Sequence, residues 1–303
     1  MSYKVGSFNV RNLNFVSNND SRRSYETIAQ IIKDEHYDII ALQEVLSSNV
    51  WLILKQYLGS EWKFAWEQPN QYLRNPQGDR RGEGYAYIWN SRRIDLVSEI
   101  INGEQRIFWP RIWKQYRKQG QRLVREPYYA RFTPNGKLGG CYCEIRLINT
   151  HIVYGDGNKL GEMMRVVEFE KIAKDIYEHI SNRVYYSSMP AYTIILGDYN
   201  LDIGKIHPVP FFDKNQIGRV VTMQGELTTL NRIKSEDGMA SSDGYANNYD
   251  HFSCSERVLT TANITSHKVN AVEKYTTNNF DKYLKEVSDH VPITMDIDLK
   301  RRK

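Results

Sequence analysis

Short apolar runs of strand length alternate along this sequence with stretches whose apolar residues recur at helical spacing. Residues 39–42 and 194–196 are apolar at every position, which is typical of strands that are buried on both faces. In residues 24–35, apolar side chains instead recur three and four positions apart, as on one side of a helix. Strands buried on both faces need other layers above and below them, so the alternation predicts an α/β fold.

The same patterns locate the individual elements. Strands are expected where apolar residues continue or alternate, and helices where they follow the helical period. No repeat, low-complexity tract or linker rich in Pro, Gly or Ser divides the 303 residues, so we expect a single domain over 1–303. The expected strands are 3–9, 38–44, 84–90, 141–150, 192–198 and 287–296, and the expected helices are 24–35, 49–58 and 162–180.

Composition excludes several classes of protein. With 41% hydrophobic and 25% charged residues the chain has the balance of a globular protein, and no apolar run approaches the ~20 residues of a membrane span. The start at Met1 leads directly into a strand pattern, without the basic and apolar regions of a secretory signal. Three cysteines cannot build a disulfide framework. We therefore expect a cytoplasmic protein that does not contact membranes.

Polar side chains follow the apolar runs at the points where strands are expected to end. The first run ends at Asn9, the next at Glu44, and two later runs end at His151 and Asp198. A fifth polar group, 288–290, precedes the last apolar run. Strand ends on one edge of a sheet converge, and ligand sites of α/β proteins are usually built at that edge. These groups therefore predict one shared site.

Part of this set suits a hard divalent cation. Glu44 and Asp289 offer carboxylate oxygens, and Asn9 offers an amide oxygen. Mg²⁺ prefers such oxygen ligands together with water and substrate phosphate, and Mn²⁺ is an alternative. The sequence therefore predicts Mg²⁺ as the cofactor.

Two histidines in the set suit acid–base chemistry. His151 and His290 each have a candidate carboxylate partner elsewhere in the chain, Glu83 for the first and Asp250 for the second. A carboxylate fixes the tautomer of an imidazole and stabilises its protonated form. Two such pairs beside a metal suit in-line hydrolysis of a phosphodiester, one activating water and the other serving the leaving oxygen or the phosphoryl charge.

Seven short motifs occur in an order that matches one known family. They resemble those of the endonuclease/exonuclease/phosphatase superfamily, and most closely those of deoxyribonuclease I, from about residue 3 to residue 298. The motifs are Ser7-Phe8-Asn9-Val10-Arg11, Leu42-Gln43-Glu44-Val45, Arg125-Glu126-Pro127, Asn149-Thr150-His151-Ile152, Gly197-Asp198-Tyr199-Asn200-Leu201-Asp202, Asn248-Tyr249-Asp250-His251 and Ser288-Asp289-His290-Val291-Pro292.

The resemblance implies a fold and a metal site. The family fold is a four-layer α/β/β/α sandwich with two mostly antiparallel sheets. By the resemblance, Glu44 ligates the divalent metal with help from Asn9 and Asp289. Asp198 and Asn200 would hold the scissile phosphate or a second metal.

The resemblance also implies different roles for the two histidines. His290, oriented by Asp250, is similar to the base that activates water. His151, oriented by Glu83, is similar to its acid or phosphate-stabilising counterpart.

The substrate groove departs from that of deoxyribonuclease I. The resemblance places Arg11 and Arg125 along the phosphate-facing groove, but no basic residue follows Val45 where the family has its minor-groove arginine. Arg80-Arg81-Gly82 stands where the subfamily has a tyrosine. We therefore expect the DNA contacts to be rebuilt, with Arg81 among them.

Residues 105–125 are predicted to form a basic aromatic insertion that contacts nucleic acid. From 106 to 125 the sequence has seven basic residues, four aromatic residues and no acidic residue, within a chain of net charge +5. Basic side chains neutralise phosphates and aromatic faces stack on bases, so Arg111 and Lys114 are candidate substrate contacts. A solvated charged face over packed aromatics, or a protein-binding surface, is the alternative.

The resulting hypothesis is a Mg²⁺-dependent phosphodiesterase, a DNA endonuclease that nicks with little sequence preference by attack of water on phosphorus. The alternative substrates within the superfamily are RNA, abasic DNA, a phosphoinositide and a sphingolipid. Lipids are disfavoured because the sequence has no amphipathic hairpin that would face a membrane. A catalytically inactive module that binds nucleic acid or protein is the alternative outside the enzymes. The expected partner is nucleic acid, with DNA favoured, and a regulatory protein is a further candidate.

Overall fold

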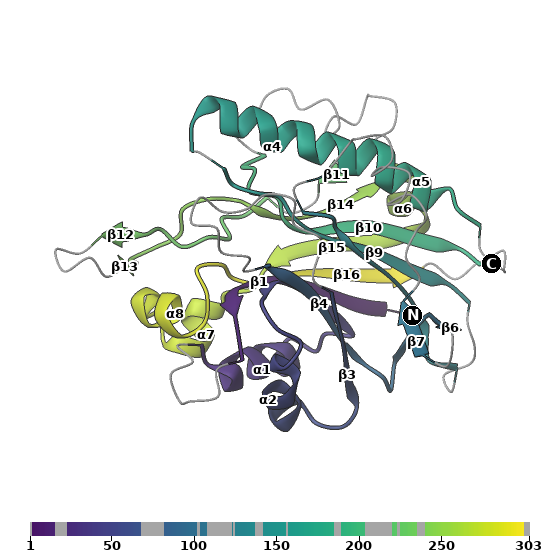
Figure 1. The fold of residues 1–303 in the computed structure, drawn as a ribbon, viewed down its shortest axis with the longest axis horizontal. Helices are drawn as coiled ribbons and strands as arrows, with labels where there is room; N and C mark the ends of the chain where they lie inside the picture. Colours follow the sequence, from purple (N-terminus) through teal and green to yellow (C-terminus); the bar gives the residue numbers. More distant parts are fainter. Residues whose placement is uncertain are drawn as a thin grey trace.

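Two six-stranded sheets pack face to face, and helices cover their outer faces (Figure 1). Helix α4 (Lys159–Lys171) lies on one side, and helices α1 (Tyr25–Asp34) and α2 (Val50–Leu58) lie on the other. This arrangement confirms the predicted α/β/β/α sandwich. The computed structural model describes residues 2–15, 23–67, 82–101, 104–107, 123, 125–136, 142–155, 157–184, 189–203, 220–222, 225–234 and 240–299.

The first sheet is antiparallel except at its centre. Its strands run in the order β15, β16, β1, β2, β4, β3, and β1 and β2 form its parallel pair. The bounds are β1 (Ser2–Leu13), β2 (Ile39–Val45), β3 (Trp62–Glu67), β4 (Gly84–Asn90), β15 (Ala262–Lys268) and β16 (Ile293–Leu299).

The second sheet repeats this plan. Its order is β11, β14, β10, β9, β8, β5, and its parallel pair is β9 with β10. The prediction of two mostly antiparallel sheets is therefore confirmed. The bounds are β5 (Ile94–Leu96), β8 (Tyr128–Pro134), β9 (Glu144–His151), β10 (Ala191–Asp198), β11 (Val220–Thr222) and β14 (Asp250–Ser255).

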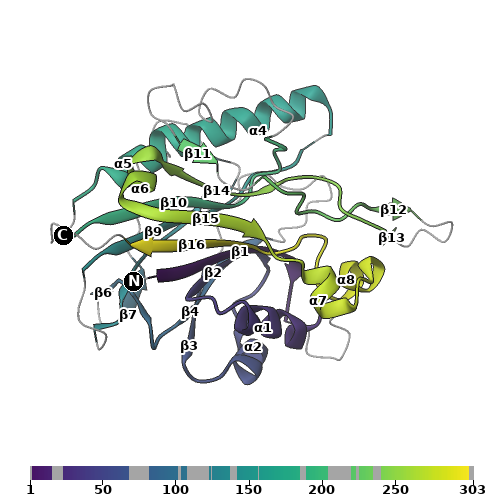
Figure 2. The ribbon, with the colours of Figure 1, turned by 180° about the vertical axis from the view of Figure 1, so that it is seen from behind.

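Smaller elements complete the described part of the chain. Two hairpins project from the sandwich, and in Figures 1 and 2 the β12–β13 hairpin lies beside α7 and α8 at the end opposite the N-terminus. The hairpins are β6 (Ser98–Ile101) with β7 (Glu104–Ile107) and β12 (Ile233–Lys234) with β13 (Ala240–Ser241). The other helices are the π-helix η2 (Ile172–Tyr177), α5 (Glu178–Ser181), α6 (Glu256–Thr261), α7 (Ala271–Thr276) and α8 (Phe280–Glu286).

The continuous apolar runs arise because each central strand faces two apolar layers. In β2, Ile39 and Ala41 belong to the core between the sheets, whereas Ile40 and Leu42 belong to the core that includes α1 and α2. In β10, Ile195 belongs to a third core with α4 and η2, while its neighbours face the inter-sheet core. Side chains alternate between the faces of a strand, so two apolar layers require an unbroken apolar run.

Most of the predicted elements are present. The strand predicted at 84–90 matches β4, and the helices predicted at 24–35 and 49–58 match α1 and α2 to within one residue at each end. Helix α1 begins at Tyr25 because Ser24 Oγ accepts a hydrogen bond of 3.1 Å from the Thr27 N–H. The helix predicted at 162–180 lies within the longer helical run of α4, η2 and α5.

One predicted strand is wrong over its first half. The pattern at 287–296 predicts a strand, but β16 starts only at Ile293 and the preceding residues form a loop. In that loop the Ser288 hydroxyl donates to the Asn9 carbonyl at 2.7 Å, and Pro292 has no N–H for a sheet hydrogen bond. The predicted insertion 105–125 lies outside the described residues except for 105–107, 123 and 125.

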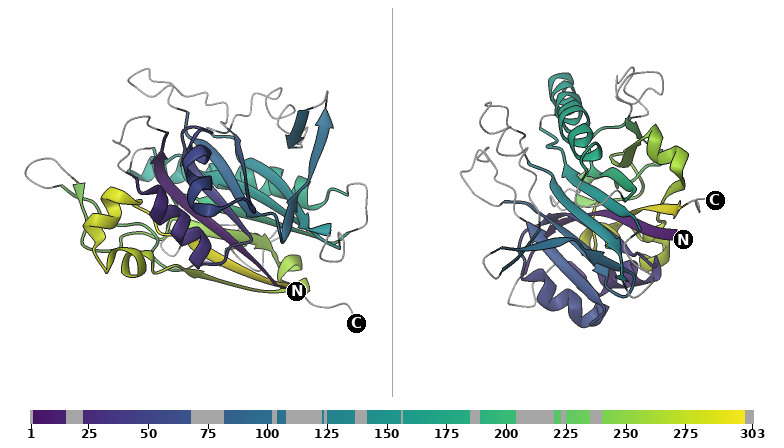
Figure 3. Two further views of the ribbon diagram at one scale, coloured as in Figure 1. Left: turned by 90° about the horizontal axis from the view of Figure 1, so that it is seen from below. Right: turned by 90° about the vertical axis from the view of Figure 1, so that its right-hand side faces the viewer.

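Polar side chains connect the two sheets near one end of the sandwich, which is seen from two further sides in Figure 3. The Gln43 amide donates to Asn149 Oδ1 at 2.7 Å, and the Asn149 amide donates to the Leu42 carbonyl at 3.0 Å. The His151 N–H donates to the Tyr85 hydroxyl at 2.9 Å. These buried bonds hold the ends of β2, β4 and β9 in fixed relative positions.

None of the helices in the described ranges is long and apolar enough to cross a bilayer.

Candidate active site

Side chains from both sheets meet at the end of the sandwich where β2, β9 and β10 finish. Asp198 and His151 are the last residues of their strands and stand opposite each other in the parallel register. Across the sheets, Asn9 Nδ2 donates to Glu44 Oε1 and to Asp198 Oδ2, both at 3.0 Å. The structure thus brings together side chains that the sequence predicts to share one site.

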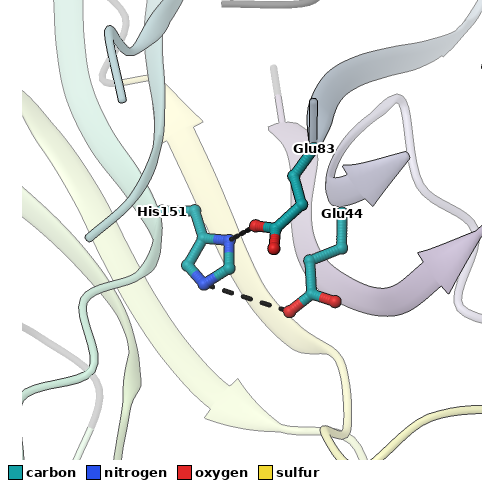
Figure 4. A group of neighbouring side chains, drawn as sticks. All are labelled: Glu44, Glu83 and His151. Atoms are coloured by element: carbon teal, nitrogen blue, oxygen red, sulfur yellow. Dashed lines mark ion pairs between the residues drawn. The ribbon is translucent and has the colours of Figure 1, made fainter. Parts of the chain in front are cut away.

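The first histidine pair joins His151 to Glu83 (Figure 4). His151 Nδ1 lies 3.3 Å from Glu83 Oε2, and its Nε2 faces Asp198 Oδ2 at 3.5 Å and Glu44 Oε1 at 4.0 Å. The ring therefore has a carboxylate behind it and two carboxylates in front of it. A hydrogen bond at Nδ1 leaves Nε2 as the atom that can exchange a proton with a substrate.

Arg125 lies beside the first histidine pair. The resemblance predicts it along the phosphate-facing groove, and in the structure its side chain is mostly buried and its guanidinium pairs with Glu83. Burial raises the pKa of Glu83, but His151 and Arg125 outweigh burial and lower that pKa. Glu83 is therefore held ionised as the partner of His151.

The second histidine pair joins His290 to Asp250. His290 Nδ1 lies 2.8 Å from Asp250 Oδ2, which also accepts a 2.7 Å hydrogen bond from the Thr228 hydroxyl. His290 Nε2 faces Asp198 Oδ2 at 3.5 Å. Burial lowers the pKa of His290, but Asp250 and Asp198 outweigh burial and raise the pKa to about 9. Both histidines thus direct Nε2 at one carboxylate oxygen.

Glu44 and Asn200 adopt left-handed backbone conformations that are uncommon outside glycine. Glu44 has φ +60° and Asn200 has φ +50°, and such residues persist where neighbouring contacts hold them. The Asn12 N–H donates to Glu44 Oε2 at 3.0 Å, and the Asn200 N–H donates to Asp198 Oδ1 at 2.8 Å. The Asn200 amide donates to the Ile152 carbonyl at 2.7 Å. Local hydrogen bonds therefore set the directions of the Glu44 and Asp198 carboxylates.

Two arginines surround Asp289, which the sequence predicts as a metal ligand. Arg11 Nε lies 3.7 Å from Asp289 Oδ2, and the Arg232 guanidinium pairs with the same oxygen. Arg11 is also anchored through its Nη1, which donates to the Leu284 carbonyl at 3.1 Å. In this arrangement the Asp289 carboxylate engages cationic side chains of the protein itself.

Three residues at the site were missed by the sequence-based predictions. Thr228 holds Asp250, Ser288 Oγ accepts from the His290 N–H at 3.1 Å, and Arg232 pairs with Asp289. Ser288 is the first residue of the last of the seven family motifs, and that motif could have identified it. Thr228 and Arg232 lie in a polar stretch without a periodic pattern, so no local signal distinguishes them.

The carboxylates and histidines form two groups that could hold a cation. Within each group the ligand atoms lie within 4.8 Å of one another, and carboxylate oxygens suit a hard divalent ion. Asn9 differs from its predicted role as an oxygen ligand, because Oδ1 accepts from the Arg11 N–H at 2.9 Å and the amide nitrogen faces the carboxylates. The groups are Glu44, Glu83 and His151, and Asp198, Asp250 and His290.

The remaining predicted substrate contacts are basic residues of the proposed groove. They are Arg81, Arg111 and Lys114, and they lie outside the described residues.

Known proteins share both the sequence pattern and the fold. The sequence matches the Endonuclease/Exonuclease/phosphatase family over residues 6–290. No curated protein matches this chain.

Solved structures resemble this one over nearly their whole length at low sequence identity. An endonuclease/exonuclease/phosphatase from Bacteroides vulgatus is 17% identical with a TM-score of 0.59, over 99% of this chain and 100% of its own. D. rerio TDP2 complexed with single strand DNA product is 15% identical with a TM-score of 0.57, over 98% and 99%. A mannosyl-6-phosphatase from Bacteroides thetaiotaomicron is 16% identical with a TM-score of 0.54, over 97% and 99%. At these identities the likeness is one of fold.

Proposed function

The chain belongs to the endonuclease/exonuclease/phosphatase family, and from this membership and the site geometry we propose that it is a metal-dependent phosphodiesterase acting on DNA. The observation that carries the proposal is the Asp198 oxygen that both histidines face. His151 Nε2 and His290 Nε2 each lie 3.5 Å from Asp198 Oδ2. Two carboxylate-backed imidazoles around one point supply a base and an acid to the same reacting group.

Each histidine pair supports one half of a hydrolysis. Asp250 holds Nδ1 of His290, so Nε2 of the neutral imidazole can take the proton from the attacking water, and the Asp250 carboxylate stabilises the imidazolium that results. Glu83 holds His151, which serves the leaving oxygen or the phosphoryl charge. Nucleophilic attack by water on phosphorus then cleaves the P–O bond and leaves a new end.

The metal in this proposal is Mg²⁺, with Mn²⁺ as the alternative. Glu44 would hold the cation. Of the two further predicted ligands, Asp289 offers a carboxylate oxygen, whereas the side-chain oxygen of Asn9 already accepts from the Arg11 N–H. When bound, the cation supplies Lewis-acid stabilisation of the phosphoryl oxygens. The carboxylates of Glu44 and Glu83, whose ligand atoms lie within 4.8 Å of each other and of His151, support this assignment through their chemistry.

DNA is the favoured substrate on two grounds. The chain carries 41 Lys and Arg residues against 36 Asp and Glu residues, and a basic excess favours a polyanion. D. rerio TDP2, whose fold resembles this one, is described in complex with a single strand DNA product. A cytoplasmic location and a regulatory protein partner stay predictions from the sequence.

A phosphomonoesterase is a second candidate. The structure of a mannosyl-6-phosphatase matches this chain over 97% of its length. A monoester has no second ester oxygen, so the same in-line attack would release inorganic phosphate rather than a new strand end. RNA, abasic DNA and lipid phosphoesters are the other substrates to compare.

The test is plasmid nicking by the purified protein in Mg²⁺, Mn²⁺ and EDTA, beside Glu44→Ala and His290→Ala. Parallel reactions contain single-stranded RNA, an abasic duplex, phosphoinositide and sphingomyelin vesicles, and mannose 6-phosphate. His267→Ala is the matched control because His267 is exposed on β15, the edge strand of the first sheet. We expect metal-dependent relaxation of supercoiled DNA that both site variants lose and the control keeps.

Other outcomes redirect or reject the proposal. Release of phosphate from the sugar, with intact plasmid, would favour the phosphomonoesterase. Cleavage of RNA or lipid alone would keep the chemistry and replace the substrate. Equal turnover by the wild type and His290→Ala would contradict the proposed role of that histidine.

A further inference from the structure

Arg232 places an exposed guanidinium at the edge of the candidate active site. It follows Leu230, which bridges to Tyr245, and directly precedes β12. Its side chain is 56% exposed, yet its guanidinium contacts the carboxylate of Asp289, whose side chain is only 9% exposed. The exposed side chain thus reaches inward to a nearly buried acid.

Arg11 approaches the same carboxylate from a fixed position. Its Nε lies 3.7 Å from Asp289 Oδ2, and its Nη1 is tied to the Leu284 carbonyl. Burial and the nearby Arg11 lower the pKa of Arg232, while Glu44 opposes this effect. One cluster of neighbouring charges therefore contains two guanidiniums, from Arg11 and Arg232, and two carboxylates, from Asp289 and Glu44.

The charge balance of the site requires cations that can face the substrate. A phosphoester is an anion, and Glu44, Asp198 and Asp289 would repel it. Arg125 is already paired with Glu83 and mostly buried. Half of the Arg232 side chain is in solvent, so it can turn toward an arriving anion, and Arg11 Nε, at 3.7 Å, still faces the Asp289 carboxylate when it does.

We propose that Arg232, together with Arg11, binds the non-bridging oxygens of the substrate's phosphoryl group, and that Arg232 leaves Asp289 as that group arrives. This assignment deepens the proposed function and rests on its phosphoester chemistry. The planar guanidinium can give two parallel N–H bonds to a phosphate, which an ammonium group cannot. Asp289 is then the resting partner of Arg232, and its carboxylate becomes available when the substrate binds.

The test compares Arg232→Ala, Arg232→Lys and the control Arg257→Ala. Arg257 is exposed in α6, beyond the end of β14 that is remote from Asp250. One measurement is kcat/KM on the phosphoester that the wild type cleaves best. The other is the rise in melting temperature caused by inorganic phosphate in EDTA, which requires neither metal nor turnover.

We expect Arg232→Ala to lose about 10- to 100-fold in kcat/KM, the range for a lost hydrogen bond to a charged group. Added guanidinium ion should restore part of this loss. Arg232→Lys keeps a cation opposite Asp289, so the fold should not suffer from an unpaired carboxylate. Its kcat/KM should nevertheless lie below that of the wild type, because an ammonium group lacks the two parallel N–H bonds. A loss of rate in this variant therefore reports on binding and not on folding. Phosphate should stabilise the wild type and Arg257→Ala but not Arg232→Ala.

The two measurements separate the inference from the proposed function. If no phosphoester is cleaved but the phosphate effect depends on Arg232, the proposed function fails and the inference stands. If phosphate does not stabilise the wild type, or if Arg232→Ala equals Arg257→Ala in both measurements, the inference is overturned.

Discussion

At the scale of single residues, His290 depends on Asp250 for both its orientation and its charge. Their contact at 2.8 Å holds Nδ1, and the Asp250 carboxylate is a main cause of the raised pKa of His290. Asp250→Asn keeps the shape of the side chain and removes its charge. We expect kcat to fall by about 10²- to 10⁴-fold. This is the range over which general acid–base catalysis contributes, and replacing the carboxylate that orients a catalytic histidine can remove as much. Steady-state hydrolysis of the preferred phosphoester measures the effect.

The control for this change is the exposed residue His267, replaced by alanine. Circular dichroism and thermal unfolding should show the same fold for Asp250→Asn and the wild type. A rate for Asp250→Asn within twofold of the wild type would contradict the coupling between the two residues.

Gly197 is a second residue whose identity is set by its surroundings. Its φ is +137°, and an added Cβ would lie 1.9 Å from the Thr150 carbonyl oxygen of the neighbouring strand. Gly197→Ala must therefore separate β9 from β10 next to Asp198 and His151. We expect a loss of about 3 kcal/mol or more in the free energy of unfolding, since overpacking and a disallowed φ act together. Chemical denaturation measures it.

Gly136→Ala is the matched control for this substitution. A Cβ at that position meets no atom within 4 Å, so its free energy of unfolding should change little. Equal stability of the two alanine variants would show that the β9–β10 contact can relax.

At the scale of elements, a buried ion cluster joins β8 to β9. The Arg131 guanidinium pairs with Glu144, and Arg146 Nε donates to Glu144 Oε2 at 2.8 Å. All three side chains are nearly buried. Glu144→Gln would leave two buried arginines without their anionic partner, so we expect a loss of about 3–5 kcal/mol in the free energy of unfolding at pH 7.

The same cluster predicts a pH dependence with a definite sign. Burial raises the pKa of Glu144, but Arg131 and Arg146 outweigh burial and lower it. A lowered folded-state pKa contributes stability above the unfolded value of about 4.3, and that contribution disappears as the pH falls through the folded value. The difference between wild type and Glu144→Gln should therefore shrink in acid. A difference that is equal at pH 7 and pH 3 in urea unfolding would contradict this assignment.

At the scale of the whole molecule, the net charge of +5 favours a polyanionic partner. The sequence predicts Arg111 and Lys114 as DNA contacts. Their double replacement by alanine should lower the slope of log affinity against log salt by about 2, since each phosphate contact contributes about 0.9. Filter binding of a short duplex across a range of salt concentrations measures the slope.

The control is the double replacement of Lys55 and Lys63, two exposed lysines on α2 and β3. Their loss changes the net charge by the same amount without removing a predicted contact. If both double variants lower affinity equally, the segment 105–125 acts only through overall charge, which would favour the solvated-face interpretation.

The sequence alone determined the layered fold and the membership of much of the site. Periodicity reports how many faces of an element are buried, so the apolar runs of β2 and β10 predicted strands between two layers. The polar residues after those runs predicted the meeting of Glu44, His151 and Asp198, because the ends of parallel strands lie at one edge. The pairing of His290 with Asp250 was predicted on other grounds, from the chemistry of the two side chains and from the family resemblance. In the structure His290 Nδ1 lies 2.8 Å from Asp250 Oδ2.

Only the tertiary structure decided which further residues complete the site. Thr228, Ser288 and Arg232 reach it through the loops between strands, and Arg125 pairs with Glu83 behind His151. Periodicity records local burial, whereas a contact such as the one between Asn9 and Asp198, 189 positions apart, depends on strand order and sheet packing. Those are properties of the whole chain, and no local pattern of residues carries them.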